Sequence, residues 1–382
     1  MKGLCCGIAV LFLVVGLLPV GAVAAGQEVP AQSAVLMDVA TGTLLYEQNA
    51  HEPLAPASVT KVMTMLLIME AIDSGALKWE DPVTASEAAA AKGGSQVYLK
   101  AGETMPVSDM LKAIAVSSAN DCACAMAEHL AGSEGAFVER MNARAGELGM
   151  GNTHFVNCTG LDDSPEAKEH RTSAYDIALM SRQLLKYHPQ IKKYTTLWMD
   201  TLRNGTFGLS NTNKLIRFYP GATGLKTGFT SGAGFCLSAS AQREGLELIA
   251  VVMGSPTSQD RFAACRQLLD RGFGTYALVE PELTEEAAVP VKLGTAQTVK
   301  AVPANREPLL IEKSQRASVT TRITLDPEVA APVSRGQRLG ELTVKAGEQI
   351  LAKIPLVAEA PVPRLTWGQM FLDLLKRVCM AK

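Results

Sequence analysis

Residues 56–68 read PASVTKVMTMLLI, and this stretch decides how the rest of the chain is interpreted. Its apolar run predicts a buried helix from Ser58 to Asp73, with Ser58 as the capping residue. Ser58 and Lys61 stand three residues apart, so a helix places both side chains on one face. A serine at a helix N-terminus is a suitable nucleophile if a lysine of lowered pKa takes its proton. Taken alone, this S-x-x-K pattern favours a capped helix with a surface lysine, although the apolar run after Lys61 favours burial of the lysine.

The surrounding sequence predicts an α+β domain. Strands are expected at both ends of this segment and helices between them, so one antiparallel sheet is assembled from both ends, with helices covering it and forming a second lobe. The expected strands are 33–38, 43–48, 224–229, 234–243 and 246–254, and the expected helices after the first are 107–116, 122–130, 134–148, 173–187 and 260–269.

Two further short motifs carry chemical groups. Ser118-Ala119-Asn120 lies between two predicted helices, where a hydroxyl and an amide can face a cleft. Lys226-Thr227-Gly228 lies on a predicted strand. Its glycine lets another backbone approach, and its lysine can attract a carboxylate. Each motif also has an ordinary structural explanation, namely helix capping for the first and a charged edge strand for the second.

Composition excludes several classes of protein. The 382 residues carry 36 Lys and Arg against 38 Asp and Glu, so the net charge of −2 gives no general case for nucleic-acid binding. With 47% hydrophobic and 19% charged residues, the chain is not a disordered protein. No cysteine or histidine spacing suits a metal, and no cofactor is expected.

The N-terminus has the pattern of a secretory signal peptide. A lysine at position 2, an apolar run over 8–20 and small residues at 22–25 predict a signal segment 1–24, hence export. An uncleaved membrane anchor is the alternative, although the apolar run is shorter than a bilayer span. Six cysteines remain in the exported chain; buried free thiols are expected, and one disulfide stays open as an alternative.

A composition change near Leu278 marks a second part of the chain. Short strands at 309–312, 319–325, 339–345 and 349–357 predict a small all-β domain over 285–358, and 358–363 reads as a stiff linker. Apolar residues at helical spacing from Trp367 to Val378, with basic flanks, predict an amphipathic helix at 364–380 lying on a membrane surface. A helix docked on the β domain is the alternative.

The three motifs in this order resemble the active-site signature of penicillin-binding proteins and serine β-lactamases. The phrases GLD at 160–162 and LIAVVMG at 248–254 are similar to D-alanyl-D-alanine carboxypeptidases of low molecular mass, as are the β domain and the amphipathic tail. The resemblance covers residues 28–380. It implies a transpeptidase-like catalytic domain at 28–277, peptidoglycan stem peptides ending in D-Ala-D-Ala as substrate, and β-lactams as covalent inhibitors. It also implies a place on the outer face of the cytoplasmic membrane.

The resemblance also implies catalytic roles. Ser58 attacks the peptide carbonyl, and Lys61 is the general base, with a pKa lowered by burial and by the cation Lys226. Ser118 relays a proton to the leaving amine. Asn120 holds Lys61 and the substrate amide.

Binding roles follow from the same resemblance. Lys226 and Thr227 bind the terminal carboxylate, beside Gly228, and Arg261 on the last helix assists. Phe229 supplies one backbone N–H of the oxyanion hole and Ser58 the other. Phe229 is a departure, since a polar residue often follows this motif, and it is expected to alter substrate preference.

Three other functions remain in view. A serine β-lactamase would need a water-activating glutamate such as Glu166 or Glu169, but the asparagine expected after it is missing. A peptidoglycan endopeptidase would use the same chemistry on cross-links. A non-catalytic wall-binding protein on this fold is disfavoured by the intact motifs.

Overall fold

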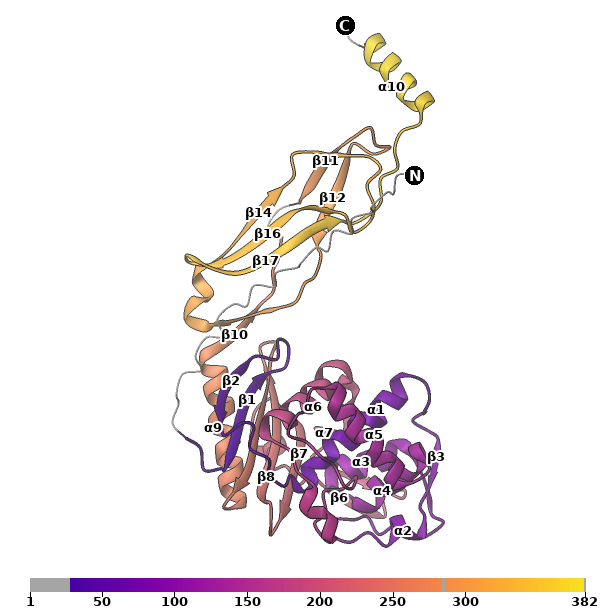
Figure 1. Cartoon of the computed structure of the whole chain (residues 1–382), viewed down its shortest axis with the longest axis vertical. Coiled ribbons are helices and arrows are strands. Elements are labelled where there is room, and N and C mark those ends of the chain that lie inside the picture. The colour runs from indigo at the N-terminus through magenta and orange to yellow at the C-terminus, as the bar shows by residue number, and fades with distance from the viewer. Residues whose placement is uncertain (1–27, 284–285, 381–382) are drawn as a thin grey trace, which may run out of the picture.

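The computed structural model describes residues 28–283 and 286–380. The predicted signal segment 1–24 and the proposed domain boundary at 285 lie outside them. The described chain forms a first domain in which helices cover a central sheet, a second domain of strands beyond it, and a helix that projects from the far end (Figure 1). The predicted α+β architecture is confirmed.

The central sheet has five antiparallel strands in the order β2-β1-β9-β8-β7. Two of these strands come from the start of the domain and three from its end, as the sequence predicts. Their bounds are β1 Ser33–Asp38, β2 Leu44–Gln48, β7 Ala222–Thr230, β8 Gly234–Arg243 and β9 Leu246–Ser255. Because β7 is the last strand of this order, one of its edges pairs with no other strand of the described sheet.

The sheet is buried on both faces, and this explains its apolar strands. Along β9, Val251 and Met253 pack into the core beneath the helical lobe, whereas Ala250 and Val252 pack into the core beneath α9, Ser258–Thr275. Alternate strand residues point to opposite faces. A strand covered on both sides therefore reads as a continuous apolar run.

The helical lobe covers the other face of the sheet (Figure 1). It is built around α1, which lies almost entirely buried and contacts α3, α4, α5 and α6. The bounds are α1 Lys61–Asp73, α2 Glu87–Ala90, α3 Val107–Ser117, α4 Asn120–Ala131, α5 Glu134–Glu147, α6 Ala174–Tyr187 and α7 Lys192–Thr195. Two further pairs of antiparallel strands belong to this part of the chain, β3 Pro82–Thr84 with β4 Thr104–Pro106 and β5 Met199–Leu202 with β6 Phe207–Ser210.

The start of the first helix differs from the prediction. Residues Ala57–Thr60 form a 3₁₀ turn, and the α-helix begins at Lys61. Ser58 makes no capping bond to the backbone; its hydroxyl instead accepts a hydrogen bond from Lys61. The tighter 3₁₀ turn brings residues three apart into line, so the serine and the lysine face each other more directly than in an α-helix.

The second domain is confirmed as all-β, with two corrections. Its six-stranded sheet has the order β14-β16-β17-β12-β11-β15, and three of these strands were not predicted. Two of them, β11 Ala288–Lys292 and β12 Thr298–Pro303, are short and carry a proline, and the third, β15, has only 2 residues. The others are β14 Val319–Leu325, β15 Val329–Ala330, β16 Arg338–Ala346 and β17 Gln349–Ala358. The predicted strand β13, Leu309–Glu312, lies outside that sheet and pairs with β10, Tyr276–Val279, directly after α9.

The C-terminal segment also differs from the linker that was expected. Val362 is buried in the β-domain core and bridges Val333, and the amide of Leu365 donates to the carbonyl of Leu293. The segment up to Leu365 therefore belongs to the β domain. Helix α10, Trp367–Met380, follows and extends away from the rest of the molecule (Figure 1).

Helix α10 is too short to span a bilayer, and no helix among the described residues is both long and apolar enough to do so. Among its side chains that the structure describes, the large apolar ones include Trp367, which is 86% exposed, and Phe371, which is 62% exposed. These side chains do not pack on the β domain.

Candidate active site

Ser58 and Lys61 are in direct contact. The ammonium nitrogen Nζ of Lys61 lies 2.9 Å from Ser58 Oγ, and the lysine is fully buried while the serine is only half-buried. A buried amine beside a reachable hydroxyl is the arrangement that general-base activation of a serine requires. The alternative of a surface lysine on an ordinary capped helix is therefore excluded.

The backbone of the loop 157–160 holds Lys61 from the other side. Lys61 Nζ donates to the carbonyl of Thr159 at 2.9 Å. The loop is turned by Asn157, whose Oδ1 accepts from the amides of Thr159 and Gly160. Gly160 has a φ of +80°, and a Cβ there would lie 1.8 Å from the carbonyl oxygen of Ala57. Sequence reasoning did not assign this loop a role, although its Asn-x-x-Gly pattern is a turn signal.

Ser118 and Asn120 flank the junction of α3 and α4, as predicted. Ser118 ends α3 in the left-handed conformation, with a φ of 64°, and is 3% exposed. Asn120 begins α4; its amide nitrogen Nδ2 donates to Gly93 O at 2.7 Å, and its Oδ1 has no partner among the described residues. The predicted hydrogen bond between Asn120 and Lys61 is not among the hydrogen bonds of the described residues: Lys61 Nζ bonds Ser58 Oγ and Thr159 O, and Asn120 Oδ1, the atom that could accept from it, has no partner there.

The Lys226-Thr227-Gly228 motif lies on β7, directly against the turn that carries Ser58. A Cβ on Gly228 would lie 2.6 Å from Pro56 O and 3.0 Å from the amide nitrogen of Ser58. Only a glycine allows this approach. Lys226 is 1% exposed and bonds the carbonyl of Thr227, whose hydroxyl donates to Thr212 Oγ1 at 2.7 Å.

Arg261 lies beneath this strand. Its Nη1 donates to Gly228 O at 2.9 Å and to Cys236 O at 3.3 Å, which ties β7 to β8. The guanidinium also lies 5.3 Å from the ring centre of Phe235, and Phe235 stacks on Phe229. Phe229 is 54% exposed, so its ring forms an apolar surface beside the end of the motif.

Burial shifts the protonation of both lysines. It lowers the pKa of Lys61 to about 7, against opposing effects of Cys158 and Asp121. It also lowers the pKa of Lys226 well below its ordinary value, and the charges of Lys61 and Arg261 add to that effect. Without substrate, the site therefore disfavours positive charge on both lysines at once. A bound anion such as a carboxylate would favour the protonated form of Lys226 again.

Glu166 and Glu169, the glutamates considered for a β-lactamase, lie on the 3₁₀ turn Pro165–Glu169 with exposed side chains. The hydrogen bonds of the described residues connect neither carboxylate to Ser58 or Lys61. This arrangement gives no support to a glutamate that activates water at Ser58.

The five cysteines whose side chains the structure describes are free and buried, which agrees with the prediction of buried thiols. They are Cys122, Cys124, Cys158, Cys236 and Cys265.

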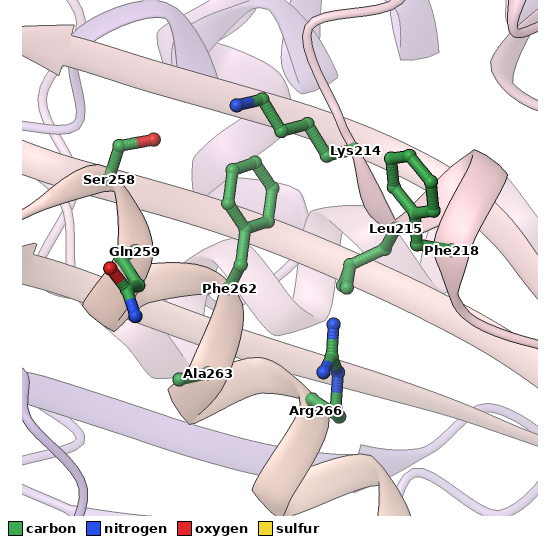
Figure 2. Close-up of a pocket in the computed structure, with 8 residues that line it drawn as sticks. All are labelled: Lys214, Leu215, Phe218, Ser258, Gln259, Phe262, Ala263 and Arg266. Atoms are coloured by element: carbon green, nitrogen blue, oxygen red, sulfur yellow. The ribbon is translucent and has the colours of Figure 1, made fainter.

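A separate hollow of about 570 Å³ lies between α9 and the short helix α8, Leu215–Phe218. Figure 2 shows its lining, in which the rings of Phe218 and Phe262 stand near Lys214 and Arg266. None of the site residues named above lines it, so the candidate site lies apart from this hollow, where β7 meets the turn that carries Ser58.

Comparison with known proteins matches both parts of the chain. Residues 21–257 match the family model described as D-alanyl-D-alanine carboxypeptidase, and residues 281–364 match that of the penicillin-binding protein 5 C-terminal domain. The D-alanyl-D-alanine carboxypeptidase DacF of Bacillus subtilis is 44% identical over 354 residues, which cover 91% of this chain and 88% of that protein.

Two solved structures show the same fold. Penicillin-binding protein 5 of Haemophilus influenzae is 30% identical and superposes with a TM-score of 0.75, covering 89% of this chain and 99% of that one. Penicillin-binding protein D2 of Listeria monocytogenes, solved in an ampicillin-bound form, is 33% identical with a TM-score of 0.59, covering 65% of this chain and all of that one (100%).

Proposed function

The chain belongs to the D-alanyl-D-alanine carboxypeptidase family and is a serine-type D-alanyl-D-alanine carboxypeptidase, and we propose that Ser58 is its acylated residue and Lys61 its general base. One observation carries this assignment. Lys61 is fully buried, its pKa is lowered to about 7, and its Nζ lies 2.9 Å from Ser58 Oγ. A neutral amine at that distance can accept the hydroxyl proton at neutral pH.

The chemistry proceeds in two steps. Ser58 Oγ bonds to the carbonyl carbon between the two terminal D-alanines while Lys61 takes its proton, and the backbone N–H groups of Ser58 and Phe229 stabilise the oxyanion. The C–N bond then breaks, and Ser118 passes a proton to the amine of the departing D-alanine. Water cleaves the resulting ester in the second step and regenerates Ser58.

Substrate binding is assigned to the motif on β7. An extended stem peptide pairs with the open edge of β7, and the Lys226 ammonium and Thr227 hydroxyl bind its terminal carboxylate. Arg261 acts from below this strand, because its guanidinium already bonds the carbonyls of Gly228 and Cys236. Asn120 Oδ1, which lacks a partner in the described structure, accepts a substrate N–H.

The test is covalent labelling. Mature protein treated with a fluorescent penicillin should carry the adduct on the peptide that contains Ser58, and Ser58→Ala should not label. An adduct on another residue would refute the assignment. Free D-alanine released from stem pentapeptides, with cross-linked dimers left intact, separates the carboxypeptidase from an endopeptidase.

The place of action is a second part of the proposal. The enzyme is exported, and α10 holds it on the outer face of the cytoplasmic membrane. The support is the exposed apolar side chains of Trp367, Phe371, Leu372 and Leu375 on a helix that extends away from the β domain. Burying such a face in the lipid interface gives firm but reversible attachment.

A truncation after Leu365 tests this attachment, because it removes α10 but keeps Val362 in the β-domain core. The shortened enzyme should stay active on a small diacyl-D-alanyl-D-alanine substrate and should no longer sediment with anionic liposomes. In the full-length mature enzyme, Phe371→Ser should weaken sedimentation, whereas Asp373→Asn, at a polar position of the helix sequence, should not. Equal sedimentation of the full-length and truncated enzymes would contradict the proposal.

A further inference from the structure

A charged pair lies behind the active site and has no role in the chemistry described above. Lys92 Nζ and Glu134 Oε2 are 2.6 Å apart, and both side chains are about three-quarters buried, with exposures of 26% and 22%. Glu134 is the first residue of α5, where the helix dipole favours a negative charge. The pair lies between the segment after α2 and the loop 157–160, which belong to distant parts of the sequence.

The second carboxylate oxygen of Glu134 binds that loop. Oε1 accepts from the amide of Cys158 at 3.3 Å and from its thiol at 3.2 Å. One carboxylate therefore joins two backbone segments, through the side chain of Lys92 on one and the backbone of Cys158 on the other.

In each of these segments, the carbonyl of the next residue along the chain accepts a hydrogen bond from a site residue. Gly93, after Lys92, accepts the Nδ2 hydrogen bond of Asn120 at 2.7 Å. Thr159, after Cys158, accepts the Nζ hydrogen bond of Lys61 at 2.9 Å.

We propose that Glu134 is a positioning residue, which sets the geometry of Lys61 and Asn120 by fixing the carbonyls of Thr159 and Gly93. The inference rests on the proposed role of Lys61 as the base. When a neutral Lys61 donates one N–H to Thr159 O, its lone pair is free to point at Ser58 Oγ. When Asn120 Nδ2 donates to Gly93 O, its Oδ1 is left for the substrate.

The pair keeps its charges at neutral pH. Burial alone lowers the pKa of Lys92, but the hydrogen bond and charge of Glu134 outweigh burial and raise it. Burial alone raises the pKa of Glu134, but the hydrogen bond and charge of Lys92, together with the hydrogen bonds of Cys158, outweigh burial and lower it. Glu134→Gln cannot replace this arrangement, because a single amide oxygen cannot face both Lys92 and the Cys158 amide. Its NH₂ group would then oppose one of these donors.

The experiment compares Glu134→Gln with a matched control. Glu70→Gln removes a similar ion pair, Glu70–Arg144, at 2.8 Å and with exposures of 25% and 22%, which lies elsewhere in the same lobe and does not contact the loop. Kinetics are measured on diacyl-D-alanyl-D-alanine. The concentration of folded enzyme, to which kcat is normalised, is measured by labelling each variant to completion with penicillin. Glu134→Gln should lower kcat about 10- to 100-fold, because small displacements of catalytic groups are costly, while KM changes less than about threefold. Glu70→Gln should stay within about twofold of the unchanged enzyme.

A second pair of variants keeps the test decisive if Glu134→Gln folds poorly. Lys92→Met removes the cation and should also lower kcat. Lys92→Arg keeps the ion pair and should retain most of the kcat of the unchanged enzyme. The proposal is overturned if Glu134→Gln and Glu70→Gln lose the same small amount of kcat, or if Lys92→Arg is as impaired as Lys92→Met. Failure of the proposed base is a different result, since it would appear in the unaltered enzyme as an acylation rate that does not change between pH 5 and 8.

Discussion

The rate of acylation should depend on pH through Lys61. With a pKa of about 7, the lysine is about 90% neutral at pH 8, half neutral at pH 7 and about 1% neutral at pH 5. If the neutral amine is the base, the acylation rate at saturating β-lactam should fall about 90-fold between pH 8 and pH 5. The slope should approach tenfold per pH unit below pH 6.

The measurement must separate this effect from the other groups that face Lys61. These groups are Asp121, Cys158, Lys226 and His170. Lys226 becomes charged as the pH falls, which strengthens carboxylate binding rather than weakening it. Stopped-flow acylation at saturating ligand removes that binding effect. Tryptophan fluorescence at each pH confirms that the enzyme remains folded.

Lys61→Arg provides the matched variant. Arginine keeps the positive charge but stays protonated, so acylation at pH 8 should fall about 10²-fold or more. An acylation rate that is flat from pH 5 to 8, or a Lys61→Arg enzyme with near-normal acylation, would refute the role of Lys61 as base.

Two further predictions concern stability and close packing. Burial lowers the pKa of His170 to about 4, so the unfolded chain binds the extra proton between pH 6.5 and 4 and stability falls as the pH falls through that window. The loss should reach about 3 kcal/mol, and urea unfolding of His170→Gln at pH 7 and 4.5 should show a smaller acid loss than His129→Gln. Gly228→Ala should lower acylation at least about tenfold, because its Cβ would lie 2.6 Å from Pro56 O, whereas Gly208→Ala, with no atom within 4 Å, should be silent. Normal acylation by Gly228→Ala would show that β7 does not approach the Ser58 turn as closely as described.

The C-terminal part of the chain shows which structural features local sequence patterns predict and which they do not. The helix at 364–380 was predicted from apolar spacing, and the structure has a helix at Trp367–Met380. The proline-rich segment before it was predicted as a linker, yet Val362 is buried in the β domain. Proline restricts the local backbone conformation, but it does not indicate which distant residue pairs with the segment. Here that residue is Val333, which pairs with Val362.

The sequence by itself determined the groups that perform the chemistry and the architecture that presents them. Ser58 and Lys61 are three residues apart, so any helical turn makes them neighbours, and strands at both ends of the domain imply one sheet. Tertiary structure decided what makes those groups reactive. Burial in the folded chain lowers the pKa of Lys61, and the carbonyl that receives its N–H belongs to Thr159, 98 positions along the chain. The Glu134 carboxylate that binds the loop lies 24 positions before Cys158. Desolvation and hydrogen-bond geometry depend on distances in space, and local sequence patterns do not encode those distances.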